Sequence, residues 1–144
     1  MSPDRVNAVV VDTMVVSSLV NSAREPALAA SYRVLIAGRP IVISFVTVTE
    51  LRYGAIKAGW GELRRRGLER DLSQLVIVQP DDRLMEICAD LRAECEREGR
   101  ALGQKIHEAD RWIAATSKRL GVPLVSDDGV FVDVSGLHVI SRSS

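Results

Sequence analysis

The chain has 144 residues, of which 47% are hydrophobic, a composition that suits one compact domain with an apolar core. Its 19 basic and 19 acidic side chains give a net charge of zero, which argues against a simple, strongly basic DNA- or RNA-binding module. No run approaches the ~18 apolar residues of a membrane span. The polar segment Met1–Asn7 has no features of a secretory signal, so a cytoplasmic protein is expected.

The first predicted strand, Asn7–Val11, is an apolar, β-branched run that ends at Asp12. An unbroken run of this kind is typical of a strand covered on both faces, as in a parallel sheet. The elements predicted next are helices over Thr13–Asn21 and from Glu25-Pro26 to Gly38, and a second strand over Ile41–Ile43. The following helix begins after Ser44, or after Thr47 if Thr47 and Glu50 form a capping box.

The second half of the chain continues the alternation of helices and strands. The predicted elements are a charged helix over Glu62–Leu72, a strand over Leu75–Val78, a long helix from Pro80 to about Glu98, a loop over Gly99–Gly103, a helix over Ile106–Leu120, and strands at Leu124-Val125 and Leu137–Ile140. This order predicts a single α/β domain with a mainly parallel sheet and helices on both faces.

The two cysteines, Cys88 and Cys95, lie seven residues apart in the long predicted helix. That spacing corresponds to a rise of ~10.5 Å, which exceeds the ~7 Å limit for bridging two Cα atoms. We therefore expect reduced thiols in the core. Two cysteines and two distant histidines also do not form a zinc pattern.

Four carboxylates lie where chemistry is expected, although each also has an ordinary structural role. Asp12 can cap a helix, Glu50 can complete a capping box, Asp110 can favour a helix dipole, and Asp128 can belong to a turn.

Taken together, the four acids indicate a shared site. Asp12 and Asp128 both follow apolar strands, and right-handed crossovers can bring Glu50 and Asp110 to the same edge of the sheet. Clustered carboxylates repel one another, and hard oxygen ligands suit Mg²⁺ or Mn²⁺. Such an ion can activate water and stabilise the leaving oxygen of a phosphodiester. The hypothesis is metal-dependent hydrolysis of a nucleic-acid backbone.

These residues also resemble a known family, the PIN-domain ribonucleases, and specifically the VapC toxins of toxin–antitoxin pairs. The similar motifs run from Val9 to about Val139 and are Val11-Asp12-Thr13, Ser44-x-x-Thr47-x-x-Glu50-Leu51-x-Tyr53-Gly54-Ala55, Asp110-x-x-Ile113-Ala114-Ala115, and Leu124-Val125-Ser126-Asp127-Asp128 followed by Phe131 and Gly136-Leu137.

The resemblance implies a three-layer fold with sheet order 3-2-1-4-5, forming one PIN domain over residues 1–144 with an ordered core of about 7–141. It also implies an Mg²⁺- or Mn²⁺-dependent endoribonuclease that inhibits translation, forms a homodimer and is held inactive by a small VapB-type antitoxin. Asp12, Glu50, Asp110 and Asp128 match the family's catalytic and metal-binding acids. Thr13 and Ser126 match its supporting hydroxyls.

Three positions depart from the family pattern. Asp127 stands where the family often has Asn or Arg, and it either supports the site or faces solvent, which we favour. Val130 stands where a further acid is sometimes found. Ser126 replaces a frequent Thr, which is a conservative change.

Several basic and aromatic residues are secondary candidates for contacts with RNA. Arg52, Lys57, Lys105 and Arg111 lie near the acidic motifs, whereas Arg64-Arg65-Arg66 is more typical of a solvated helix face. His107 lies close to Asp110 in sequence, although a role outside the site is favoured for it, and Trp112 is expected in the core.

Other functional classes fit less well. A receiver domain needs a lysine near its last strand, and Met14 stands where an Asp-x-Asp phosphatase needs its second acid. A PIN-fold module that binds RNA or protein without cleaving it remains the alternative.

Overall fold

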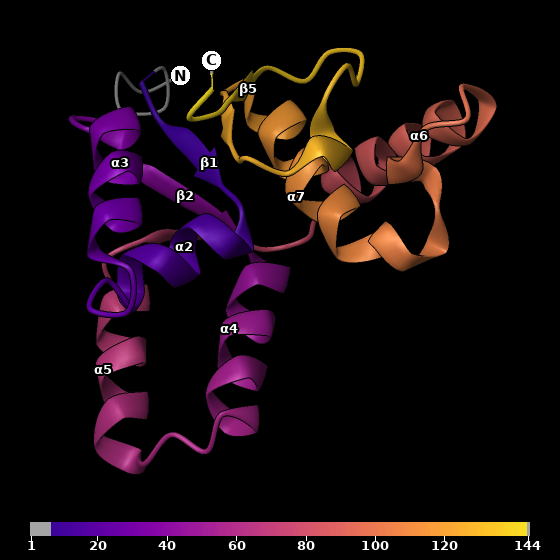
Figure 1. Ribbon diagram of the computed structural model, residues 1–144. Coiled ribbons are helices and arrows are strands. Elements are labelled where there is room, and N and C mark those ends of the chain that lie inside the picture. The colour runs from indigo at the N-terminus through magenta and orange to yellow at the C-terminus, as the bar shows by residue number, and fades with distance from the viewer. Residues whose placement is uncertain (1–6, 144) are drawn as a thin grey trace.

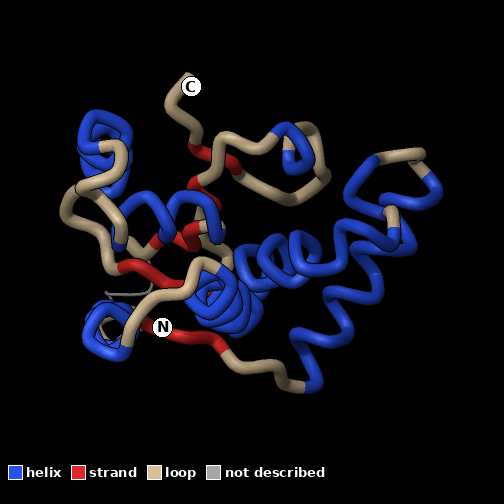
Figure 2. The backbone as a smooth tube through the Cα atoms, turned by 60° about the horizontal axis from the view of Figure 1, so that its bottom comes forward, coloured by secondary structure: helices blue, strands red, loops and turns tan. Residues whose placement is uncertain are grey.

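The structure, a computed structural model, describes residues 7–143 and is built on one parallel β-sheet (Figures 1 and 2). Its five strands lie in the order β3-β2-β1-β4-β5. They are β1 (Val9–Val11), β2 (Ile41–Ser44), β3 (Val76–Val78), β4 (Leu124–Val125) and β5 (Val139–Ile140). All neighbouring pairs run parallel. The predicted fold class and sheet order are confirmed.

Helices connect these strands and cover both faces of the sheet. The described residues form α2 (Thr13–Val20), α3 (Pro26–Ile36), α4 (Phe45–Lys57), α5 (Glu62–Leu72), α6 (Asp82–Arg97) and α7 (Glu108–Leu120), with short 3-10 helices η1 (Ala101–Gly103), η2 (Lys105–His107) and η3 (Gly129–Phe131). Most predicted boundaries agree within a few residues. The predictions of a loop over Gly99–Gly103 and of a helix starting at Ile106 were wrong, because 3-10 turns occupy much of this segment.

The central strand β1 divides the core into two halves. Val9 and Val11 pack on one face with side chains of α2, α3, α4 and α5. Val10 points to the other face and packs with side chains of α6 and α7. Because side chains alternate along a strand, three consecutive valines are buried only when both faces are covered. In Figure 1, α4 and α5 extend beyond the sheet as a pair joined by a short loop.

The start of α4 decides where Glu50 lies. Ser44 caps this helix, since its hydroxyl accepts a hydrogen bond from the Val46 N–H at 3.3 Å. The alternative start at Thr47 was wrong. With Ser44 as the cap, Glu50 lies in the second turn of α4.

The buried side chain of Arg111 accounts for the 3-10 turns that precede α7. Its side chain is 2% exposed, and its guanidinium donates hydrogen bonds to the carbonyls of Leu102, at 3.0 Å, and Gln104. A buried guanidinium is stable only with such acceptors, and these two hold the chain in 3-10 turns ahead of α7. Arg111, one of the secondary candidates for contact with RNA, is therefore engaged with the protein's own backbone.

Replacing Arg111 with Met is expected to lower the free energy of unfolding by roughly 2–4 kcal/mol. The change leaves two carbonyls without their donor, and each buried unpaired group costs about 1–3 kcal/mol. Urea unfolding measures the loss. Arg119→Met is the control, because the Arg119 side chain is 39% exposed and surface changes usually stay within about 0.5 kcal/mol. Equal stability of the two variants would contradict this role of Arg111.

Two further expectations concern cysteines and membranes. Cys88 and Cys95 are both buried and free, which confirms the prediction of core thiols. Among residues 7–143, no helix is both long and apolar enough to cross a bilayer.

Candidate active site

The carboxyl end of β1 holds a buried carboxylate. Asp12 is 5% exposed and caps α2, with its Oδ1 accepting from the Val15 N–H at 2.9 Å. Its Oδ2 accepts a hydrogen bond from the hydroxyl of Ser126, which follows β4. Both carboxylate oxygens are therefore oriented, yet each has a lone pair left for another ligand.

Ser126 couples the ends of β1 and β4. Its hydroxyl accepts a hydrogen bond from the Asp128 N–H at 3.0 Å. Because a serine hydroxyl carries one proton and donates it to Asp12, Ser126 is fully oriented by its two neighbours. Ser126 is 1% exposed, so water does not compete for these bonds.

Asp128 begins the 3-10 helix that follows β4. Its Oδ1 accepts from the Val130 N–H at 3.0 Å and so caps η3. Unlike Asp12, Asp128 is exposed. The turn thus presents this carboxylate to solvent beside the buried pair of Asp12 and Ser126.

The electrostatics around Asp12 favour a cation. Burial raises the pKa of Asp12 above its ordinary value, and hydrogen bonds from Ser126 and Val15 offset part of this effect. The negative charges of Asp128 and Asp110 raise the pKa of Asp12 further. A bound cation would relieve both the desolvation and the repulsion.

Glu50 is oriented by a chain of two threonine hydroxyls. Thr13 Oγ1 donates to Glu50 Oε1 at 2.7 Å and lies 3.1 Å from Thr47 Oγ1. Since Thr13 gives its only hydroxyl proton to Glu50, Thr47 is the donor in the second bond. Thr47 is fully buried. In the sequence, Thr47 belonged to a family motif and to a possible capping box, but its hydrogen bond to Thr13 was not predicted.

Under the sequence-based hypothesis of RNA cleavage, replacing Thr47 with Val is expected to lower the cleavage rate about 10-fold, the lower end of the effect of losing a group that orients a ligand. The methyl group keeps the packing but cannot donate to Thr13. Thr47→Ser should retain most activity. Thr49→Val is the control on the same helix, because Thr49 is exposed. A Thr47→Val rate equal to that of the control would contradict the orienting role.

Asp110 lies in the first turn of α7 and contacts a histidine. His107 Nδ1 is 2.9 Å from Asp110 Oδ2, and their side chains are 29% and 30% exposed. The sequence favoured a role for His107 outside the site, so this contact is a finding of the structure. This contact holds the Asp110 carboxylate toward η2.

The four acids share one edge of the sheet but do not form a closed ligand set. Asp12, Asp110 and Asp128 are near enough to interact electrostatically, whereas Glu50 is turned to Thr13. Within residues 7–143, no group of three or more His, Cys, Asp or Glu side chains is arranged to hold a metal ion. Convergence of all four side chains in one ready cluster is therefore not observed, and side-chain rotation would be needed.

Asp127 is bonded to residues other than the four acids. Its Oδ2 accepts from the Tyr32 hydroxyl at 2.7 Å, and it pairs with Arg142. Burial alone raises the pKa of Asp127, but the hydrogen bonds from Arg142 and Tyr32 lower it overall. Burial and the bond to Asp127 raise the pKa of Tyr32 to about 12. Asp127 thus accepts hydrogen bonds from Tyr32 of α3 and from Arg142, which follows β5.

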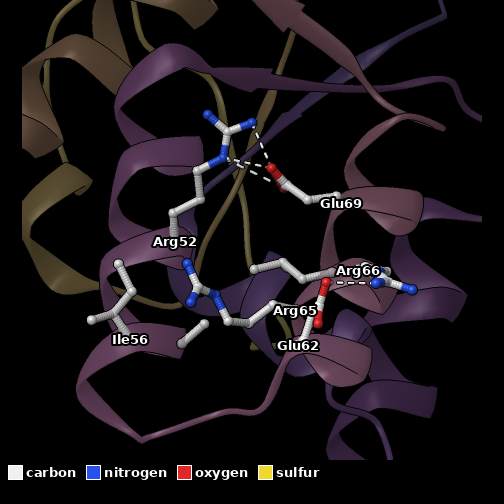
Figure 3. A pocket seen from close by; sticks show the side chains of 8 residues that line it. Arg52, Ile56, Glu62, Arg65, Arg66 and Glu69 are labelled. Atoms are coloured by element: carbon white, nitrogen blue, oxygen red, sulfur yellow. Dashed lines mark hydrogen bonds and ion pairs between the residues drawn. The ribbon is translucent and has the colours of Figure 1, made fainter.

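The arginines near α4 and α5 are mostly engaged with protein groups. A cavity of about 350 Å³ lies between these helices (Figure 3). Beside it, Arg52 pairs with Glu69 at 2.7 Å, and Arg66 pairs with Glu62 at 2.5 Å. Arg64 lies over the ring of Trp60, 3.9 Å from its centre. The run 64–66 is exposed, as predicted.

Comparisons with known proteins agree with the fold. A family model described as PIN domain matches residues 9–137. A chain in the structure of VapBC2 from Rickettsia felis bound to a promoter DNA fragment is 22% identical, with a TM-score of 0.76 and coverage of 93% of this chain and 98% of that one. No curated protein sequence is significantly similar.

Two further solved structures show the same likeness. DNA-bound VapBC from Salmonella typhimurium contains a chain that is 24% identical, with a TM-score of 0.76 and coverage of 94% of this chain and 98% of that one. VapBC-5 from Mycobacterium tuberculosis, described as a member of the VapBC family of toxin–antitoxin systems, is 24% identical, with a TM-score of 0.66 and the same coverage. At these identities the likeness establishes the fold.

Proposed function

This chain belongs to the PIN domain family, and we propose that it is a metal-dependent endoribonuclease, the toxin of a VapBC-type pair. Nuclease activity is general among PIN domains of VapC toxins. The observation that carries the proposal is the buried Asp12 carboxylate, oriented by Ser126 and crowded by the charges of Asp110 and Asp128. Such an arrangement is costly unless a cation binds there.

The donor set fits a hard divalent cation. Asp12, Asp128 and Asp110, joined by Glu50 after rotation of its exposed side chain, would supply the carboxylate oxygens that Mg²⁺ or Mn²⁺ prefers. When bound, the ion would supply Lewis-acid stabilisation of the phosphodiester and lower the pKa of an attacking water.

The chain's own residues would prepare this site. Ser126 holds Asp12 in one orientation and keeps the Asp128 backbone against it. Thr47 and Thr13 hold Glu50 near the start of α2, from where its side chain would rotate to reach the ion. Asp12, which would keep its hydrogen bonds, would lose little freedom when a metal binds, which favours affinity.

Cleavage of RNA by the purified protein tests the proposal. We expect cutting of a mixed-sequence RNA with Mg²⁺ or Mn²⁺ and none after EDTA treatment, with activity restored by excess metal. Equal cutting in EDTA would overturn the metal requirement. Metal-independent RNA binding without any cleavage would support the alternative of a non-cleaving PIN-fold module.

A groove beside the site suits the antitoxin. It has a volume of about 540 Å³ and runs from Thr13 and Glu50 toward Trp60 and Arg64, between α2, α4 and α5. Met14 at its edge is 74% exposed. A VapB-type segment with apolar residues could lie in this groove and place a basic side chain near the acids, which would inhibit cleavage. Full activity of the complex with the protein encoded next to this gene would contradict this arrangement.

A homodimer is part of the same proposal. Tyr53, Ile56 and Leu63 on α4 and α5 are 61%, 59% and 79% exposed, and exposed apolar patches commonly mark protein interfaces. Analytical ultracentrifugation should show a dimer that Ile56→Glu with Leu63→Glu dissociates. A monomeric wild-type chain at micromolar concentration would contradict it.

A further inference from the structure

The segment after β5 lies at the edge of the sheet that carries the candidate site, because β5 runs parallel to β4. Val125 of β4 pairs in register with Ile140 of β5. Two residues beyond this pair, Asp127 lies opposite Arg142, so the strand register itself brings the two side chains together.

Three groups meet on the Asp127 carboxylate. The Arg142 N–H donates to Oδ1 at 2.9 Å, and the Arg142 Nε donates to Oδ2. The Tyr32 hydroxyl donates to the same Oδ2 at 2.7 Å. The Arg142 guanidinium also lies 5.3 Å from the centre of the Tyr32 ring. We call Tyr32, Asp127 and Arg142 the C-terminal latch.

Tyr32 makes the latch rigid on one side. It is 6% exposed, and its ring packs with buried side chains of the core half that contains Val9 and Val11. A phenol fixed in this way presents its hydroxyl at one point in space. The latch therefore ties the turn after β4 both to α3 and to the chain after β5.

Asp127 lies in sequence between Ser126, which donates a hydrogen bond to Asp12, and Asp128, whose charge acts on Asp12. Asp127 is joined by a peptide bond to Ser126 on one side and to Asp128 on the other, so hydrogen bonds that fix its carboxylate also limit the movement of both neighbours. Ser126 in turn donates to Asp12 and accepts from the Asp128 N–H.

We propose that Tyr32, Asp127 and Arg142 are positioning residues, which hold Ser126 and Asp128 in the orientation that metal binding and RNA cleavage require. Geometric errors of about 1 Å in such supporting groups can cost up to about 100-fold in rate. The inference rests on the proposed function and adds to it a dependence on the residues that follow the last strand.

Variants that remove single latch contacts test this inference. Tyr32→Phe removes one hydroxyl, and Arg142→Gln removes the guanidinium but keeps the backbone N–H. Each should weaken Mn²⁺ affinity, measured by calorimetry, and lower kcat by about 10-fold, with KM for RNA unchanged. The double variant should lose less than the product of the single effects, because both contacts act through Asp127. Arg142→Lys should restore part of the loss.

A control variant separates positioning from stability. Arg119→Gln breaks a surface ion pair with Asp81 at 3.4 Å. It should alter neither Mn²⁺ affinity nor kcat. Latch variants with a lower Tm but Mn²⁺ affinity and kcat within twofold of the wild type would overturn the inference.

Hydrogen exchange distinguishes failure of the latch from failure of the nuclease proposal. The Asp128 amide, which donates to Ser126, should exchange at least about 10-fold faster in the latch variants, with no metal or RNA present. The Val11 amide should be unaffected. A wild-type protein that neither binds Mn²⁺ nor cuts RNA would contradict the nuclease proposal. An unchanged exchange rate of the Asp128 amide in the latch variants would contradict the positioning role of the latch.

Discussion

Asp12→Asn should lower the rate of RNA cleavage by more than about 100-fold, while the protein remains folded. Loss of an orienting group beside a metal site typically costs about 10–100-fold, and Asp12 is the proposed ligand itself. Asn keeps the shape and can still cap α2 through its carbonyl oxygen, but it removes the charge that would hold a cation. Single-turnover cleavage with saturating Mn²⁺ measures the effect.

The same variant has an unusual consequence for stability. The pKa of Asp12 is raised above the unfolded value of 3.8 by burial and by Asp128 and Asp110. The folded chain therefore binds a proton more tightly than the unfolded chain. This carboxyl favours the fold most below the unfolded pKa, and that contribution is lost as pH rises through the folded pKa. At neutral pH the charge opposes folding.

Asp12→Asn, neutral at every pH, should therefore raise Tm at neutral pH. The gain should shrink as pH falls toward 3.8. Thermal unfolding without divalent metal from pH 4 to 8 measures the difference from the wild type. Asp90→Asn, at an exposed position on α6, is the control and should change neither activity nor Tm. Wild-type cleavage by Asp12→Asn, or a lower Tm, would contradict the electrostatic account.

Ser126→Ala should weaken both Mn²⁺ affinity and cleavage by about 10–100-fold. Alanine removes the donor to Asp12 and the acceptor for the Asp128 N–H, so both flanking acids lose their orientation. Ser126→Thr retains both bonds and should keep most activity.

The matched pair of variants makes this test specific. A small cavity or a general loss of packing would affect Ser126→Ala but would not explain why Thr, a larger side chain, remains active. Mn²⁺ titration and cleavage rates should change together across the series. If Ala and Thr behave alike, the hydroxyl does not position Asp12.

Local sequence patterns determined much of the scaffold. The apolar runs that end at Asp12 and Ser126 predicted two buried strands with polar residues directly after them, and the structure has strands there. Ser44 was also a correct cap. These features depend on residues only a few positions apart in the chain. Side-chain periodicity and capping preferences describe interactions over that range, so they can be used to predict such features. Sheet order came instead from the motifs shared with the PIN family.

Only the tertiary structure decided how the side chains are paired. Ser126 and Asp12 are 114 residues apart, and Thr13 and Glu50 are 37 apart. Arg111 was a sequence-based candidate for RNA contact, but its guanidinium binds the buried carbonyl of Leu102. Asp127 proved to be tied to Tyr32, 95 residues earlier. A hydrogen bond depends on distances of about 3 Å between groups, and no local pattern encodes which distant group the fold brings within that range.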